Sequence, residues 1–326
     1  MFRPVQFLLY LPIQFLLIPF AVVGLIDGII KGVVKSRKLG VSFSACRALQ
    51  YKWFMHYFGT RADPLSVKFI KKFPCESHFG LLSTFGALIL AQKLFGFTTS
   101  FGKIDSPGEE TYFSFAGPRI LKFDAILKKY SDSVEQIVVP GAGFDLAVLG
   151  ITKDKSIRVF ELDQPATIDI KVETLKSAKI EHNWITYIPV DYENESWTEK
   201  LLSSGFDKSK RTLFVWQSVS LFLEEASVRE SLKKMAELCS DGSIVVQDLY
   251  SKAFISGEAS KAVKRASRMI EKREPWRFGL DMSNDPKASI ATFLNECGLQ
   301  MTNCTQFGDK LEIKPYYCII EAEKTD

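Results

Sequence analysis

Glycines and acids follow consecutive predicted strands in the middle of the chain. A buried strand leads into residues 140–145 (Pro-Gly-Ala-Gly-Phe-Asp), where Gly141 and Gly143 let the backbone approach a ligand closely. Glu161 and Asp163 come about twenty residues later, at the end of the next strand. A carboxylate at that place can bind both hydroxyls of a ribose, so the pattern indicates a nucleotide-type ligand.

Two further acids occupy comparable places. Asp145 closes the glycine segment, and Asp191 ends the third strand, where it could meet the amino group of an adenine. Either aspartate could instead cap the helix that follows it, which is a purely structural role. Acids at the ends of three consecutive strands favour ligand binding over core packing.

A nicotinamide dehydrogenase is the competing interpretation of the same segment. Its fingerprint requires a third glycine three residues after the second, and Leu146 occupies that place. Adenosine with a short charged tail therefore fits the segment better than a dinucleotide does.

Strands and helices alternate from about residue 115 onward. The predicted strands are 136–139, 157–161, 185–189, 212–216 and 243–247. Each is a run of β-branched and large apolar residues, which predicts an α/β fold with a doubly wound, mostly parallel sheet covered on both faces. Residues 317–321 add an expected antiparallel edge strand.

Histidines and cysteines do not suggest a metal site. The three histidines are not paired at helical spacing, and the six cysteines show no C-x-x-C spacing. We therefore expect neither a metal site nor a disulfide framework, and we expect reduced, mostly buried thiols.

The first 38 residues are both hydrophobic and basic. The run Phe7–Ile26 contains one strongly polar residue, Gln14, and as a helix it would be about 30 Å long, the thickness of a bilayer core. It exceeds the apolar core of a signal peptide and no small-x-small cleavage site follows, so we expect a single uncleaved membrane anchor. Pro12 and Pro19 would kink it, which leaves a helix lying in one leaflet as the alternative to a spanning helix.

The distribution of charge agrees with a membrane surface. Five basic residues among the first 38, against the single acid Asp27, account for the whole net charge of +4. The rest of the chain is neutral, which argues against nucleic acid as a partner. The basic cluster at 31–38 outweighs Arg3, so the positive-inside rule places everything after it in the cytoplasm.

Other apolar and basic segments are expected to cover the site. The shorter run Phe79–Ala91 is predicted to be a buried core helix. Helices within 43–97 and the stretch 253–282 are expected to act as lids. Within that stretch, the basic run 261–273 could cover the site, touch a membrane or simply form a solvated helix.

Short motifs in a fixed order resemble the leucine carboxyl methyltransferase family. The matching segments are Ala45-Cys-Arg-Ala48, Asp63-Pro-Leu65, Arg119 with Phe123-Asp124, Gly141-Ala-Gly-Phe-Asp145, Val159-Phe-Glu-Leu-Asp-Gln-Pro165, 215–223 and 274–279. The resemblance covers roughly residues 43–322, and 159–165 is its most specific piece. It implies a Rossmann-like methyltransferase fold with an N-terminal helical extension, and S-adenosylmethionine as cofactor.

The resemblance also implies roles for single residues. In that family an arginine ahead of the glycine loop holds the cofactor's methionine carboxylate, and Arg119 stands at the matching place. Asp163 matches the ribose ligand, with Glu161 as the alternative, while Asp191 and Tyr192 match the adenine contact. The complete expected cofactor-binding set is Arg119, Gly141, Gly143, Asp145, Glu161, Asp163, Asp191, Tyr192 and Gln217.

Three departures from the family pattern keep a second interpretation open. Leu146 and Ala147 replace the usual threonine and arginine, Gln217 replaces a frequent glutamate, and Gly117-Pro118 precedes Arg119. The chain is thus expected to be a membrane-associated methyltransferase, or a binding protein of the same fold that has lost catalysis. No conspicuous histidine or lysine base accompanies the site, which favours a carboxylate acceptor over a hydroxyl, because a carboxylate is already ionised at neutral pH. The acceptor is expected to be a small or lipid-like molecule.

These inferences divide the chain into three expected parts. Residues 1–38 form the hydrophobic membrane anchor with its basic flank, and residues 39–114 form a helical cap or lid. Residues 115–326 form the domain that binds S-adenosylmethionine.

Overall fold

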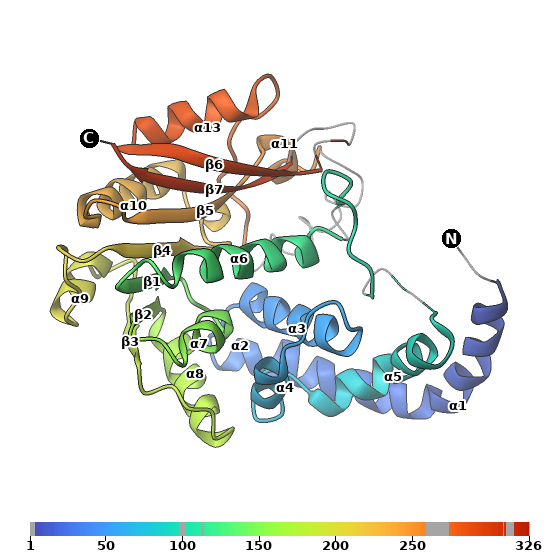
Figure 1. Ribbon diagram of the computed structural model, residues 1–326. Helices are drawn as coiled ribbons and strands as arrows, with labels where there is room; N and C mark the ends of the chain where they lie inside the picture. The colour runs from blue at the N-terminus through green and yellow to red at the C-terminus, as the bar shows by residue number, and fades with distance from the viewer. Residues whose placement is uncertain are drawn as a thin grey trace. The chain divides into compact units, whose positions relative to one another are not determined.

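The computed structural model describes residues 4–97, 99, 102–111, 114–258, 274–308, 310 and 316–325 (Figure 1). The predicted basic run 261–273 lies outside these residues. The chain forms two compact units. The first comprises Met1–Ile104, Gly143–Leu146 and Asp169–Glu181, and the second comprises Asp105–Ala142, Ala147–Ile168 and His182–Asp326.

The second unit is built on a seven-stranded sheet of order β3-β2-β1-β4-β5-β7-β6. Its strands are β1 (Gln136–Pro140), β2 (Arg158–Asp163), β3 (Ile185–Pro189), β4 (Thr212–Trp216), β5 (Ile244–Tyr250), β6 (Leu299–Phe307) and β7 (Tyr317–Lys324). Strands β1 to β5 pair in parallel, and β7 pairs antiparallel with both β5 and β6. The predicted doubly wound, mostly parallel sheet is confirmed.

The expectation that residues 317–321 form an edge strand is wrong. Strand β7 lies inside the sheet, and the true edge is β6, which the sequence did not predict as a strand. The first six residues of β7 are all buried, because β5 and β6 cover both of its sides. Strand β6 contains several polar residues and is only partly buried, as an edge strand tolerates. Because of this composition, the sequence pattern does not predict it as a strand.

Helices connect the strands of the second unit as the sequence pattern indicates. They are α6 (Ala116–Tyr130), α7 (Ala147–Thr152), α9 (Trp197–Ser203), α10 (Glu225–Leu238), α11 (Lys252–Ile255) and α13 (Pro286–Asn295), with the short 3-10 helix η3 (Ser220–Phe222). In α10 the buried residues Val228, Leu232 and Met235 recur at intervals of four and three, so a single apolar face packs into the core. Helix α8 (Pro165–Ser177) runs from the second unit into the first.

The first unit is helical. It contains α1 (Pro4–Ile29), the π-helical turn η1 (Ile30–Lys35), α2 (Ser36–Lys38), α3 (Phe43–Tyr57), α4 (Pro64–Ile70) and α5 (His78–Phe95). The starts of α3, α4 and α5 are fixed by capping side chains of Ser42, Asp63 and Ser77, which accept hydrogen bonds from backbone N–H groups of the first turn. That these helices act as lids stays a prediction.

Helix α5 differs from its prediction as a buried core helix. It continues beyond Ala91 to Phe95 and ends at Gly96, whose φ of 65° forms a left-handed cap. Only 28% of the residues of this helix are buried, and the side chains of Phe79, Leu90 and Leu94 are exposed. The helix lies beside α1 (Figure 1), and both helices are long and apolar enough to cross a membrane. Gln92 and Lys93 interrupt the apolar run, and for this reason the sequence predicts a shorter helix than the structure has.

Close packing of α1 on α5 depends on glycine. A Cβ at Gly24 would lie 2.6 Å from the Cβ of Ser83 and 3.0 Å from the carbonyl oxygen of Gly80, whereas a Cβ at Gly28 would meet nothing within 4 Å. We expect Gly24→Ala to lower the free energy of unfolding by about 1–3 kcal/mol, the usual cost of overpacking. Gly28→Ala is the matched control and should be neutral or stabilising by up to about 1 kcal/mol, because alanine favours the helix. Thermal unfolding of both variants in a mild detergent measures the difference, and equal stabilities would contradict the close approach.

Candidate functional site

The loops after β1 and β4 meet at the point where the strand order of the sheet reverses. Gly141 follows β1 with a φ of 71°, and a Cβ there would lie 2.4 Å from Cγ2 of Val219, in the loop after β4. The N–H groups of Gly141 and Ala142 donate to the carbonyl oxygen of Leu162 at 2.8 and 3.1 Å. A glycine is therefore required in this turn, at the edge of the sheet where doubly wound folds bind nucleotides.

The acids at the end of β2 lie in different environments. Asp163 is half-buried at the end of the strand, and its Oδ1 accepts a hydrogen bond from the N–H of Gln164 at 2.7 Å. Glu161, two residues earlier on the same face of the strand, is only 1% exposed. Its negative charge adds to the effect of burial in raising the pKa of Tyr187. The accessible carboxylate at the sheet edge is thus that of Asp163.

Tyr192 lies close to both Gly141 and Asp163. The N–H of Gly141 donates to the Tyr192 hydroxyl at 3.3 Å. Although 38% of the residue is exposed, its hydroxyl end is enclosed, and this burial, followed by the charge of Asp163, raises the pKa of Tyr192. Residues that the sequence predicts to share one site are here brought together in the second unit.

Asp191 is engaged in its own turn. Its carboxylate accepts hydrogen bonds from the side chain of Asn194 at 2.9 Å and from the N–H of Glu193 at 3.1 Å. The side-chain bond from Asn194 is the main cause that lowers the pKa of Asp191. The alternative of a structural role in the turn after the strand therefore has direct contacts in its support.

Gly143 and Asp145 belong to the first unit, where two lysines hold the aspartate. The Asp145 carboxylate pairs with the ammonium of Lys52, whose side chain is 3% exposed, and the ammonium of Lys171 donates to the Asp145 carbonyl oxygen at 2.8 Å. A Cβ at Gly143 would lie 3.3 Å from the Cβ of Ala45, so this glycine allows α3 to approach. Asp145 thus fixes the glycine segment to α3.

Arg119 is buried rather than on a solvated helix face. Arg119 is 9% exposed. Its Nη1 donates to the Ser218 hydroxyl and lies 3.7 Å from Oδ2 of Asp248. Arg119 is on α6 and Ser218 directly follows the end of β4, so the guanidinium lies beside the predicted cofactor edge. A planar guanidinium in this position suits a bidentate grip on a carboxylate.

Asp248 is the residue that the sequence analysis missed. Its side chain is fully buried, and it accepts hydrogen bonds from the Ser218 N–H at 2.8 Å, the Ser218 hydroxyl at 3.2 Å and the Tyr317 hydroxyl at 2.9 Å. Burial raises the pKa of Asp248, while Arg119 and these donors oppose the rise. The available signal was an aspartate inside the apolar run Ile244–Tyr250, because a charge in a central strand needs a partner.

Ser218 adopts an uncommon backbone conformation for a residue other than glycine. Its φ is 57°, in the left-handed region. The three hydrogen bonds that join it to Arg119 and Asp248 hold it there. Strained residues of this kind cluster at functional sites. Gln217, just before it, is half-buried at the end of β4, as the sequence position predicts.

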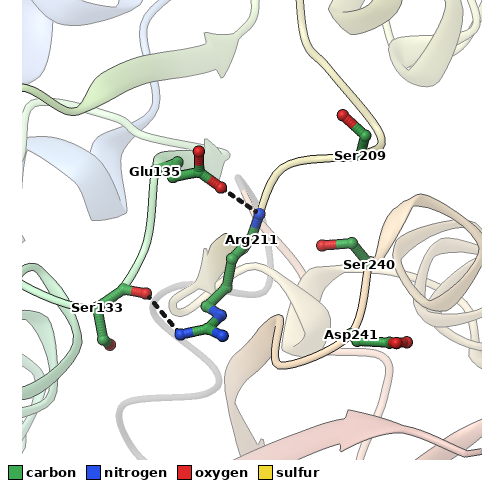
Figure 2. Close-up of a pocket in the computed structure, with 6 residues that line it drawn as sticks. All are labelled: Ser133, Glu135, Ser209, Arg211, Ser240 and Asp241. Atoms are coloured by element: carbon green, nitrogen blue, oxygen red, sulfur yellow. Dashed lines mark hydrogen bonds between the residues drawn. The ribbon is translucent and has the colours of Figure 1, made fainter.

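A surface hollow of about 630 Å³ lies at the amino ends of the strands, opposite the ends that carry Gly141 and Asp163 (Figure 2). Its lining residues precede β1, β4 and β5: they are Ser133, Glu135, Ser209, Arg211, Ser240 and Asp241. Arg211 uses its Nη1 to donate to the Ser133 carbonyl oxygen at 3.1 Å, and its N–H to donate to Glu135 at 3.2 Å. The hollow is therefore a polar surface at the amino ends of the strands, away from the edge where this kind of sheet binds ligands.

Comparisons with known proteins agree with the motifs. Residues 103–236 match the model of the family described as leucine carboxyl methyltransferase. A protein of Mycolicibacterium paratuberculosis named "Putative S-adenosyl-L-methionine-dependent methyltransferase" is 29% identical over 154 residues, which are 46% of this chain and 48% of that protein. A protein of the same description from Streptomyces coelicolor is 28% identical over 134 residues, 41% of this chain and 47% of its own. The chain spans about half the length of the curated relatives it matches.

Two of the solved structures to which the chain is similar carry the name of a methyltransferase. The magnesium protoporphyrin IX methyltransferase of Synechocystis PCC 6803, with bound S-adenosylhomocysteine, has a TM-score of 0.44 and 10% identity, over 68% of this chain and 90% of that one. The mitomycin 7-O-methyltransferase has a TM-score of 0.43 and 11% identity, over 65% and 56% of the two chains.

The sheet itself defines the class of fold. A parallel sheet that reverses between β1 and β4, with the antiparallel β7 inserted between β5 and β6, is the Rossmann-like fold of S-adenosylmethionine-dependent methyltransferases. Within that class, residues 103–236 are similar to the leucine carboxyl methyltransferase family, whose model they match.

Proposed function

We propose that the chain is an S-adenosylmethionine-dependent methyltransferase that methylates an oxygen of a small or lipid-like acceptor at a membrane surface facing the cytoplasm. The observation that carries the proposal is the edge formed by Gly141 and Asp163, in a segment that matches the family model. The glycine turn leaves no room for a side chain, and the acid beside it is accessible. These two properties fit the ribose end of the cofactor.

The expected cofactor-binding residues of the second unit then have defined roles. The cofactor supplies an electrophilic methyl group on a sulfonium. Arg119 would bind the methionine carboxylate, Asp163 the ribose hydroxyls, and Asp191 with Tyr192 the adenine. By holding the cofactor and excluding water, these residues align the acceptor for displacement, and such positioning alone can lower a barrier by several kcal/mol, on the order of 7–11 kcal/mol in the best cases.

A carboxylate acceptor agrees best with the residues near Arg119. The carboxylate of Asp248 is fully buried and already accepts hydrogen bonds from Ser218 and Tyr317, so it is not placed to take a proton from an acceptor hydroxyl. Burial raises the pKa of Tyr317, so this tyrosine keeps its own proton. A carboxylate needs no base because it is ionised at neutral pH. The acceptor carboxylate, like the cofactor, would need only alignment.

The second candidate is a binding protein of the same fold that does not transfer methyl groups. Leu146 and Ala147 are 2% and 8% exposed, so neither can replace the polar side chains that the family pattern has there. Gln217 lacks the charge of the family's glutamate. Retained cofactor binding without any methylated product would support this alternative.

Two measurements separate these functions. We expect calorimetry to detect binding of S-adenosylmethionine and S-adenosylhomocysteine but not of NAD. Labelled-methyl transfer to cell extract, divided into lipid, small-molecule and protein fractions, then identifies the acceptor class. Binding of NAD alone would overturn the proposal, and binding without label transfer would favour the non-catalytic protein.

Asp163→Ala should weaken binding of S-adenosylmethionine by about 2 kcal/mol, or roughly thirtyfold, because a charge-assisted contact to the ribose is lost. Glu161→Gln, two residues earlier on the strand, is the matched comparison and should leave the affinity nearly unchanged. Calorimetric titration of both variants measures the two effects. The opposite ranking would move the ribose contact to Glu161.

A further inference from the structure

The exposed surface of α1 is apolar around most of the helix. Neighbouring positions such as Phe15 and Leu16 are 70% and 76% exposed, and Val22 and Val23 are both more than half exposed. A helix that packs on protein in water normally presents a polar face to the solvent. Helix α1 presents no such face among its described residues, which is typical of a helix surrounded by lipid.

Helix α5 runs antiparallel to α1 and is joined to it near both ends. The Gln6 side chain donates to the carbonyl oxygen of Phe95 at 2.6 Å, near the start of α1 and the end of α5. Near the opposite ends, the Ser77 hydroxyl donates to the carboxylate of Asp27. Any arrangement of α1 in a membrane must therefore include α5.

Helix α5 also contacts helix α3, which carries charged residues. The rings of Phe54 and Phe85 are 4.6 Å apart, and the Gln92 side chain donates to the carbonyl oxygen of Phe58 at 2.8 Å. Helix α3 also carries Arg47 and the buried Lys52. If α5 crossed a bilayer, these contacts would draw α3 and its charges into the hydrocarbon, which is costly.

The order of the chain excludes a crossing by α5. Lys52, which precedes α5, pairs with Asp145, which follows it, and the rings of Phe73 and Phe144 are 4.5 Å apart. These contacts require both segments to lie on one side of any membrane. Between them, α5 is the only helix in the described part of the chain that is long and apolar enough to cross. A single crossing would separate segments that are in contact, so α5 does not cross, and α1, held along it, does not cross either.

We propose that α1 and α5 form a monotopic docking element that enters one leaflet of a bilayer with anionic headgroups. The inference rests on the proposed membrane attachment and defines its geometry: the helices lie in the leaflet and do not span it. The exposed basic residues Lys35, Arg37 and Lys38 directly follow the apolar stretch, where they can bind the headgroups. Pro12 and Pro19 lie inside α1, which curves rather than running straight (Figure 1).

Glycosylation in microsomes shows on which side of the membrane each segment lies, and so tests whether α1 and α5 span the bilayer. An Asn-x-Thr glycosylation acceptor is inserted before Pro4 or after Lys103 in the full chain, while the native acceptor Asn194-Glu-Ser196 reports on the second unit. We expect the protein to stay with the microsomes after an alkaline wash and none of the three acceptors to be modified. The same chain behind a cleavable secretory signal is the positive control. Modification of the acceptor before Pro4 would show that α1 spans and would overturn the inference.

Vesicle flotation tests the part played by α5. Leu94→Glu changes a residue that is 64% exposed, and the matched control Leu202→Glu changes a residue on α9 that is 37% exposed. With vesicles of phosphatidylcholine and phosphatidylserine, we expect Leu94→Glu to lower the partition coefficient about tenfold and the control to leave it unchanged. Unchanged flotation of Leu94→Glu would overturn the inference. If the variant also had half the molecular mass of the wild-type protein in solution, this face would be assigned to a second copy of the chain.

The same assay distinguishes failure of the inference from failure of the proposed function. If the wild-type chain does not float at all, membrane attachment itself is wrong. If it floats but the α5 variant behaves like the control, only the two-helix geometry is wrong. Binding of S-adenosylhomocysteine, measured on each variant, reports on the cofactor site and the fold independently of lipid.

Discussion

Arg119→Ala is expected to weaken binding of S-adenosylhomocysteine about ten- to a hundredfold, because a bidentate charge-assisted contact with a carboxylate contributes roughly 1.5–3 kcal/mol. Adenosine lacks that carboxylate and should bind the variant and the wild type alike, since Asp163 and Gly141 are unchanged. The measured quantity is the ratio of the two losses in calorimetric titrations.

The structure supplies the control for this measurement. Arg229 on α10 also contacts two carboxylates, those of Glu225 and Glu296, but these ion pairs are partly exposed and include none of the expected cofactor-binding residues. Arg229→Ala should leave the affinity for both ligands unchanged. Equal losses for S-adenosylhomocysteine and adenosine in Arg119→Ala would show that the arginine only supports the fold, and the family-based role of Arg119 would have to be withdrawn.

The strands of the parallel sheet could be predicted because each is a local run of apolar residues between helical stretches. Strand β4 matches its predicted range, 212–216, and β3 matches 185–189. The handedness of βαβ units restricts the possible orders of these strands, and the order itself comes from the structure. Strand β6 was missed because its residues alternate irregularly between polar and apolar, so no continuous apolar run marks it as a strand.

The candidate site was predictable only where its residues follow strands. Gly141 and Asp163 are found by counting from strand ends, since the carboxyl ends of parallel strands meet at one edge. The contacts of Arg119 with Ser218 and Asp248 join residues about a hundred or more positions apart, and no local pattern encodes that pairing. The pairing of Lys52 with Asp145 was hidden for the same reason, and together with the Phe73–Phe144 contact it requires the two segments to lie on one side of any membrane.

Asp248→Ala is expected to lower the free energy of unfolding by about 3–5 kcal/mol, the usual cost of removing one partner of a buried ion pair. The Arg119 side chain is 10% exposed and would lose the carboxylate that lies 3.7 Å from its Nη1. The Tyr317 hydroxyl and the Ser218 N–H would lose their acceptor as well.

Denaturant unfolding in a mild detergent, followed by tryptophan fluorescence, measures this loss. Asp248→Asn keeps one acceptor oxygen in the same place, so we expect it to lose less stability than the alanine variant. Asp191→Ala is the matched control, because its carboxylate bonds within an exposed turn and its loss should leave the stability nearly unchanged. A loss in Asp248→Ala no larger than in Asp191→Ala would mean that Arg119 is held by Ser218 and by helix packing, and that the buried carboxylate contributes nothing to its position.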